Sequence, residues 1–125
     1  MSATSTLKVM LVEDHLAFRQ ALAFLLGREP DVEVVAQAGS LAQARQMLHT
    51  PLDIAVVDLA LPDGDGRELI GELRQSNAGI SVVVLSAAIA PGQLEEVVKA
   101  GADAVLHKIA SPQTIVEEVR RLAGR

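Results

Sequence analysis

The sequence predicts a single α/β domain in which parallel strands alternate with helices. Five short runs rich in Val, Ile and Leu alternate with five stretches in which apolar residues recur at helical spacing. Three of the runs are almost continuously apolar, which is typical of strands covered by helices on both faces. The chain has 125 residues, 50% of them hydrophobic, and no Cys, so one domain can bury a core without disulfides.

The predicted strands are short, and a helical stretch separates each strand from the next. In chain order they are Leu7–Val12, Val32–Ala38, Ile54–Val57, Ile80–Leu85 and Ala104–His107. An order of strand, helix, strand throughout the chain favours a parallel sheet, because each helix returns the chain to the same edge.

Each predicted helix carries one apolar stripe at a spacing of three or four residues. The five stripes, in order, are Phe18, Ala21, Leu22, Leu25 and Leu26; Leu41, Ala44 and Leu48; Leu69, Ile70 and Leu73; Leu94, Val97 and Val98; and Ile115, Val116, Val119 and Leu122.

Local signals mark several helix ends. The spacing of Ser40 to Gln43 and of Asp65 to Glu68 predicts capping boxes, and Ser111 stands before Pro112 at a first helical position. Glycines are expected just after the first and fourth helices, at positions 27 and 101.

Composition excludes several functional classes. The formal net charge is −5, and two Phe are the only aromatic residues, so direct nucleic-acid binding by this segment is not expected. Residues 1–6 are small and polar without signal-peptide features, which predicts a flexible tail before a domain at 7–125. No uncharged stretch is apolar enough to span a membrane, and the absence of Cys suits the cytoplasm.

Polar side chains stand where four of the five predicted strands end. Glu13 and Asp14 follow the first strand, Asp58 the third, Ser86 the fourth, and Lys108 the fifth. Each alone has a simpler explanation, such as a helix cap or a turn. Because parallel strands bring their carboxyl ends to one edge, the set predicts a single site there.

The chemistry of this set suggests a metal-assisted phosphoryl-transfer site. Glu13, Asp14 and Asp58 would repel one another unless a cation or a raised pKa relieves them. Oxygen ligands without His or Cys favour Mg²⁺, which binds one or two carboxylates and a phosphoryl oxygen. A Lys and a hydroxyl can hold further phosphoryl oxygens, and one carboxylate remains as a nucleophile.

Four segments together resemble the receiver domain of two-component response regulators, over essentially the whole chain. They are Leu-Val-Glu-Asp-His at 11–15, Val-Asp-Leu-Ala-Leu-Pro-Asp-Gly-Asp-Gly at 57–66, Val-Leu-Ser-Ala at 84–87, and Ala-Gly-Ala-Asp-Ala-Val-Leu-His-Lys at 100–108. The first two look most like receivers of helix-turn-helix transcription regulators.

The resemblance implies a flavodoxin-like, doubly wound sheet of five parallel strands in the order 2-1-3-4-5, with five helices. It implies that Asp58 is phosphorylated, and that Ser86 and Lys108 contact the phosphoryl group. Mg²⁺, or Mn²⁺ in its place, would bind Asp14, Asp58, the backbone carbonyl of Ala60, and Glu13 through water.

The same resemblance implies partners rather than a catalysed small-molecule reaction. The phosphoryl donor would be a phosphohistidine on a sensor histidine kinase or a phosphotransfer protein, with small acyl phosphates as substitutes. The domain would be a signalling module and not an enzyme. A homodimer through the fourth helix, the fifth strand and the fifth helix is a further expectation.

Three departures from the family pattern bear on the output step. Val105 stands where many members have an aromatic residue that moves with the hydroxyl, so no ring can switch there. Ile109 follows Lys108 where Pro is common. Ala60 and Ala88 are small at positions that influence water access in the family.

Two alternatives remain at this point. An aspartate-nucleophile phosphohydrolase also uses a strand-end Asp with Mg²⁺, but it needs an acid two residues later, where this chain has Ala60. The sequence is also compatible with either a stand-alone phosphorelay receiver or the regulatory half of a DNA-binding transcription regulator.

Overall fold

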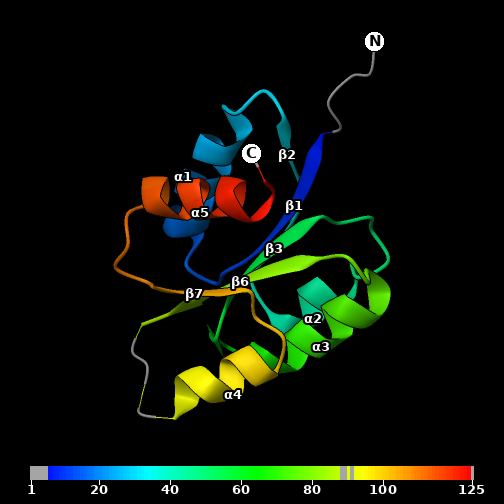
Figure 1. The fold of residues 1–125 in the computed structure, drawn as a ribbon, viewed down its shortest axis with the longest axis vertical. Helices are drawn as coiled ribbons and strands as arrows, with labels where there is room; N and C mark the ends of the chain where they lie inside the picture. Colours follow the sequence, from blue (N-terminus) through cyan, green and yellow to red (C-terminus); the bar gives the residue numbers. More distant parts are fainter. Residues whose placement is uncertain (1–5, 88–89, 91, 125) are drawn as a thin grey trace.

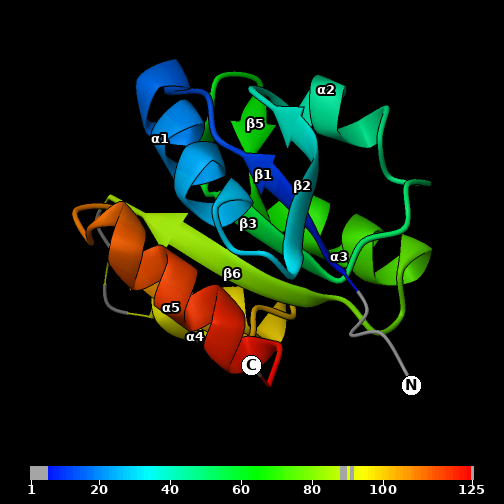
Figure 2. The ribbon, with the colours of Figure 1, turned by 90° about the horizontal axis from the view of Figure 1, so that it is seen from above.

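The computed structural model describes residues 6–87, 90 and 92–124, and its centre is a five-stranded parallel sheet with helices on both faces (Figures 1 and 2). The strands are β1 (Leu7–Val12), β2 (Val32–Ala38), β3 (Ile54–Asp58), β6 (Ser81–Ser86) and β7 (Ala104–His107). Their order in the sheet is β2-β1-β3-β6-β7, and every pair is parallel. The predicted 2-1-3-4-5 order is confirmed.

Five helices cover the sheet: α1 (Leu16–Gly27), α2 (Leu41–Arg45), α3 (Arg67–Ser76), α4 (Gln93–Lys99) and α5 (Pro112–Leu122). Helices α1 and α5 lie together on one face, and α2, α3 and α4 lie on the other (Figure 1). Within the described residues, none of these helices has both the length and the apolar character needed to span a membrane.

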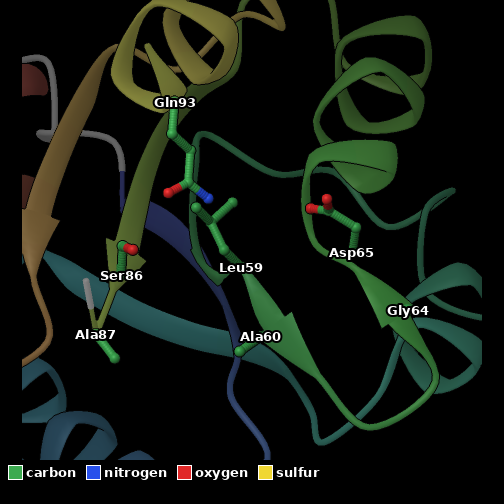
Figure 3. Close-up of a pocket in the computed structure, with 7 residues that line it drawn as sticks. All are labelled: Leu59, Ala60, Gly64, Asp65, Ser86, Ala87 and Gln93. Atoms are coloured by element: carbon green, nitrogen blue, oxygen red, sulfur yellow. The ribbon is translucent and has the colours of Figure 1, made fainter. Parts of the chain in front are cut away.

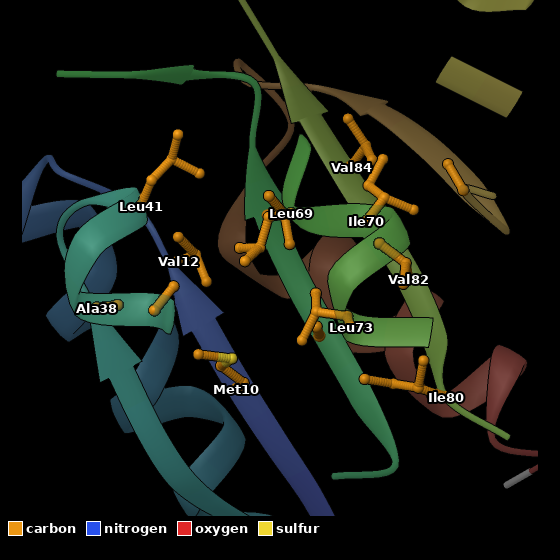
Figure 4. Packing of buried hydrophobic residues seen from close by; sticks show 14 of the residues in the cluster. Met10, Val12, Ala38, Leu41, Leu69, Ile70, Leu73, Ile80, Val82 and Val84 are labelled. Atoms are coloured by element: carbon orange, nitrogen blue, oxygen red, sulfur yellow. The ribbon is translucent and has the colours of Figure 1, made fainter. Parts of the chain in front are cut away.

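Alternate residues of the central strands enter two different hydrophobic clusters. In β1, Met10 and Val12 face Leu69, Ile70 and Leu73 of α3, as Figure 4 shows. The residues between them pack on the opposite face, where the fully buried members include Val9, Leu11, Leu26, Ile115 and Val119. This two-residue period explains why the strands are apolar throughout.

Two of the predicted helix starts are confirmed. The Ser40 hydroxyl accepts a hydrogen bond from the Gln43 N–H (3.1 Å), while the Gln43 side chain accepts from the N–H of Gly39 (2.7 Å). The Ser111 hydroxyl accepts from the Thr114 N–H (3.2 Å) at the start of α5. Both helices therefore begin with a satisfied backbone donor.

The predicted capping box of Asp65 and Glu68 is wrong. The residue before α3 is Gly66, and Asp65 instead accepts from the N–H of Arg67 (2.8 Å). The other carboxylate oxygen of Asp65 accepts from Nε of Arg67 (2.8 Å). The backbone of Asp65 pairs with Ala60 in a short antiparallel hairpin that the sequence did not predict, β4 (Ala60–Leu61) with β5 (Gly64–Asp65).

The glycine predictions have mixed outcomes. Gly27 is the last residue of α1, with Arg28 as its cap, so Gly27 does not follow the helix as expected. Gly101 follows the cap of α4 with a φ of +116°, a conformation that favours glycine.

Helices α2 and α4 also differ from expectation. Helix α2 ends before Leu48, because the chain tightens into turns with N–H bonds from Gln46 and Met47 to carbonyls three residues earlier.

In α4, Val97 alone of the predicted stripe is buried, whereas Leu94 and Val98 are about half exposed (48% and 52%). Residues 1–5 of the predicted tail lie outside the described residues, and so does Ala88.

Candidate functional site

Four strand ends bring buried polar groups to one edge of the sheet. Asp58 is the last residue of β3 and Ser86 the last of β6, while Glu13 and Lys108 directly follow β1 and β7. The side chains of Glu13, Asp58 and Ser86 are almost completely buried, with exposed fractions of 3%, 1% and 3%. The convergence that the sequence predicted is therefore present.

Lys108 joins the two buried carboxylates. Its ammonium lies 2.7 Å from Oδ2 of Asp58 and 2.9 Å from Oε1 of Glu13. Burial disfavours the charged form of Lys108, but its hydrogen bonds to the two carboxylates outweigh burial and raise its pKa above the ordinary value. A backbone bond from the Lys108 N–H to the Ser86 carbonyl (2.7 Å) places the start of the Lys108 side chain beside β6.

The three acids form a compact oxygen cluster. One carboxylate oxygen from each of Glu13, Asp14 and Asp58 lies within 4.8 Å of the others. Burial, and then the neighbouring Asp58 carboxylate, raises the pKa of Glu13 to about 7, against the opposing effects of Lys108 and the His15 N–H. One ammonium therefore does not fully relieve this cluster of negative charge.

The donor set fits a hard divalent cation. All the side-chain donors are carboxylate oxygens, as Mg²⁺ prefers, and the cluster contains no His or Cys. Oε2 of Glu13 is buried and has no hydrogen-bond partner among the described residues, so it can serve as an acceptor. Asp14 is exposed at the mouth of the cluster.

The loop after β3 fixes the Asp58 side chain. Oδ1 of Asp58 accepts from the Ala60 N–H (3.0 Å), and the Leu59 N–H donates to the Leu85 carbonyl of β6 (3.1 Å). The Gly66 N–H then donates to the Leu59 carbonyl (2.9 Å), so the chain folds back against β3. A Cβ at Gly66 would overlap the carbonyl oxygen of Asp58, which explains the glycine.

A cavity of about 440 Å³ opens beside this loop. Leu59 and Ala60 form its floor, Ser86 lies on one side, Asp65 on the other, and the Gln93 side chain of α4 reaches into it (Figure 3). The cavity is lined by Ser86 at the end of β6, by the two residues that follow Asp58, and by the first residue of α4.

Other predicted positions lie around this edge. Val105 is half-buried on β7, opposite Val84 of β6, and packs against the cluster on the α2–α4 face. His107 is exposed, and its Nδ1 accepts from the Ile109 N–H (3.2 Å) rather than contacting the acids. No described peptide bond is cis, including the one before Ile109.

Sequence reasoning missed two residues that hold this edge in place. Arg19 donates through Nη1 to the Glu13 carbonyl (2.8 Å). Asp63, between β4 and β5, accepts from the N–H groups of Leu41 (2.8 Å) and Ala42 (3.0 Å) at the start of α2. The second contact spans more than twenty residues, so no local pattern could signal it.

Residues 9–120 match the family model of the response regulator receiver domain. The transcriptional regulatory protein UhpA of Salmonella typhimurium (strain LT2) is 36% identical over 116 residues, which are 92% of this chain and 58% of UhpA. The chain thus spans little more than half the length of the curated relatives it matches.

Solved structures agree with the sequence match. A two-component response regulator of the LuxR family from Aurantimonas sp. SI85-9A1 has a TM-score of 0.83 at 31% identity, over 97% of this chain and 88% of that one. A response regulator protein from Burkholderia pseudomallei, solved with a phosphorylated aspartic acid, a calcium ion and citrate, has a TM-score of 0.78 at 25% identity, over 94% of this chain and 72% of that one. With its sheet order, its strand-end acids and lysine, and a match over residues 9–120, this chain belongs to the receiver domain family of two-component response regulators.

Proposed function

We propose that Asp58 is the residue of this receiver that accepts the phosphoryl group. The observation that carries the proposal is the 2.7 Å contact between Lys108 Nζ and Asp58 Oδ2 beside two further acids. Asp58 is the acid that ends the central strand, and it directly precedes Leu59 and Ala60, which line the cavity. The phosphorylated aspartic acid of the Burkholderia pseudomallei relative supports the same chemistry here.

Receiver domains bind Mg²⁺ at an acidic pocket, and we assign that role to particular atoms of this chain. Asp14, Asp58 and the backbone carbonyl of Ala60 would bind the ion directly, and Glu13 through water; Mn²⁺ can replace Mg²⁺. Bound at these residues, the ion would neutralise charge on the acids and on the transferred group. Glu13 must lose its proton to take part, since a protonated carboxyl binds a cation poorly.

The transfer itself needs few protein groups. A carboxylate oxygen of Asp58 forms the new P–O bond as the P–N bond of a phosphohistidine, or the P–O bond of an acyl phosphate, breaks. The leaving imidazole or carboxylate keeps the bonding electron pair. Lys108 and Ser86 each donate to a phosphoryl oxygen and so stabilise the charge that spreads over these atoms.

Output follows from the position of Ser86 next to α4. A hydroxyl drawn to a phosphoryl oxygen pulls on the chain that leads into Gln93, at the start of α4. Val105 is too short to act as a rotating switch, so the displacement of α4 itself carries the signal. This signal would change the surface of α4, β7 and α5, where we propose a phosphorylation-dependent homodimer.

Receiver domains of this type interact with sensor histidine kinases, and the relatives of this chain include transcriptional regulators. We propose that a sensor histidine kinase or a phosphotransfer protein donates the phosphoryl group in the cytoplasm. Residues 7–125 would form the receiver, with a tail before them. We propose that the whole protein controls transcription and that this segment does not itself contact DNA.

The test is phosphorylation of the purified domain. Incubation with MgCl₂ and acetyl phosphate should add one phosphoryl group, and mass spectrometry should map it to Asp58. Asp58→Asn should remain unlabelled, whereas Asp53→Asn, at the opposite end of the same sheet, should label like the wild type. Labelling of Asp58→Asn at the wild-type level would overturn the assignment.

A further inference from the structure

Both backbone polar groups of Glu13 form hydrogen bonds. The Glu13 N–H donates to the Ala38 carbonyl at the end of β2 (2.9 Å). At that point the chain leaves the sheet, so the Glu13 carbonyl has no strand partner and instead accepts from Nη1 of Arg19 (2.8 Å). The direction in which the chain continues to Asp14 therefore depends on a side chain of α1.

The guanidinium of Arg19 is committed to this contact. None of the ion pairs found among residues 6–87, 90 and 92–124 involves Arg19. Its Nε is buried without a hydrogen-bond partner in the described part of the chain, which is an unfavourable environment for a donor. Arg19 thus donates to the Glu13 carbonyl beside the acidic cluster while its own Nε stays unsatisfied by any described residue.

The β2–α2 junction is shaped to accept Arg19. A Cβ at Gly39 would lie 3.0 Å from Nη1 of Arg19, so the guanidinium rests against bare backbone. Gly39 is itself fixed, because its N–H donates to Oε1 of Gln43 (2.7 Å). A side chain at Gly39 would crowd the Arg19 guanidinium, which would have to shift by a few tenths of an ångström.

Asp14 has little else to position it. Its side chain is exposed, and the described part of the chain offers it no hydrogen bond and no ion pair. Its carboxylate nevertheless lies within 4.8 Å of oxygens of Glu13 and Asp58. The backbone at the Glu13–Asp14 peptide must therefore supply the placement.

We infer that Arg19 is a positioning residue for divalent-cation binding, acting on Asp14 through the Glu13 carbonyl. The inference rests on the proposed function, because it assumes that the acidic cluster binds Mg²⁺. It makes a prediction opposite in sign to simple electrostatics. If electrostatics alone decided, removing a positive charge near the acids would strengthen cation binding, because it removes a Coulomb repulsion. Loss of a residue that orients a metal ligand instead weakens binding.

The experiment measures Mg²⁺ affinity from backbone amide chemical shifts during titration with MgCl₂. Arg19→Ala should raise the dissociation constant about tenfold, the lower end of the effect seen when residues that orient metal ligands are removed. Arg19→Lys keeps a charged donor and should recover most of the affinity. Arg28→Ala is the matched control, since it removes the same charge from an exposed position at the opposite, C-terminal end of the same helix.

Gly39→Ala provides a test that leaves all charges unchanged. The added methyl group would lie 3.0 Å from Nη1 and crowd it, so we expect it to weaken Mg²⁺ binding in the same direction as Arg19→Ala but by a smaller factor. Thermal unfolding in EDTA reports the stability of each variant separately from metal binding. If Arg19→Ala does not fold, Gly39→Ala and Arg19→Lys decide the question.

The outcomes separate the inference from the proposed function. If Asp14→Asn binds Mg²⁺ as well as the wild type, the metal assignment fails and the inference fails with it. If Asp14→Asn loses binding while Arg19→Ala and Gly39→Ala bind as tightly as the wild type or more tightly, only the role of Arg19 is overturned. In an Asp14→Asn background, Arg19→Ala should cause little further loss, because both changes act on the same ligand.

Discussion

The ammonium of Lys108 lies 2.7 Å from Oδ2 of Asp58, although fifty positions of sequence separate the two residues. The same ammonium contacts Glu13, so two buried carboxylates share one cation. Phosphorylation of Asp58 would therefore alter an ion pair that the unmodified protein already uses to support its fold.

We expect Lys108→Ala to destabilise the metal-free protein at neutral pH by roughly 1–3 kcal/mol, the cost of leaving buried polar groups unsatisfied. Urea unfolding in EDTA measures this free energy. Addition of MgCl₂ should recover part of the loss by binding the native state alone. Lys99→Ala, on the exposed face of α4, serves as the control, and equal stability of the two variants would contradict the prediction.

Glu13 should make the stability of the metal-free protein fall as the pH rises. Its pKa is raised to about 7 from the ordinary value of 4.5, so the native state holds this proton more tightly than the unfolded chain. Its contribution is complete below about pH 4.5 and is lost as the pH rises to about 7. Denaturant titrations in EDTA from pH 5 to 8 should show a shallower decline for Glu13→Gln than for Glu33→Gln, an exposed control on β2.

Asp63 should show the opposite pH dependence. The N–H groups of Leu41 and Ala42 lower the pKa of Asp63 below the ordinary value of 3.8. Its contribution to stability is therefore present above that pH and is lost as the pH falls through the native-state pKa. Asp63→Ala should therefore be less stable than the wild type at pH 5, with a smaller difference at pH 3. Asp63→Asn keeps an acceptor without the charge, so its stability at pH 5 should lie between those of Asp63→Ala and the wild type. A stability difference that is the same at both pH values would argue against this role.

Gly66 and Gly71 should respond to alanine in opposite directions. A Cβ at Gly66 would overlap the Asp58 carbonyl, and the backbone must shift, at a cost of about 1–3 kcal/mol. Gly71 lies inside α3 with no other atom within 4 Å of an added Cβ, so Gly71→Ala should stabilise by about 0.5–1 kcal/mol. Chemical denaturation of both variants tests the pair, and Gly66→Ala should also slow labelling by acetyl phosphate.

A beryllofluoride phosphoryl mimic should move α4 through Ser86. With MgCl₂ present, amide chemical shifts in residues 92–100 should change in the wild type and change little in Ser86→Ala. The amides of β2, at the far edge of the sheet from β7, provide the internal control. An identical response of residues 92–100 in both proteins would exclude Ser86 as the link.

Local patterns were sufficient to predict the strands and the polar residues that lie together at the strand ends. The β-branched runs gave strand positions within one residue, and the parallel topology then brought Asp58, Ser86 and Lys108 together. The β4–β5 hairpin escaped prediction because its strands are too short to show a period. The roles of Asp63 and Arg19 depend on contacts between elements, which no local spacing encodes.

The exposure of Leu94 and Val98 illustrates another limit. Their spacing matches a buried stripe, but α4 presents only Val97 to the core and leaves the other two half exposed. Periodicity identifies which residues share a helix face, but how far that face sinks into the core depends on tertiary packing.

The partition of the interior by the sheet has a consequence for how mutations combine. Ile54 and Ala55 are adjacent in β3, yet their side chains belong to separate clusters on opposite faces. Changes of shape on the α2–α4 side can therefore occur while the packing of α1 and α5 stays the same. Core substitutions in different layers should therefore have nearly additive effects on the free energy of unfolding.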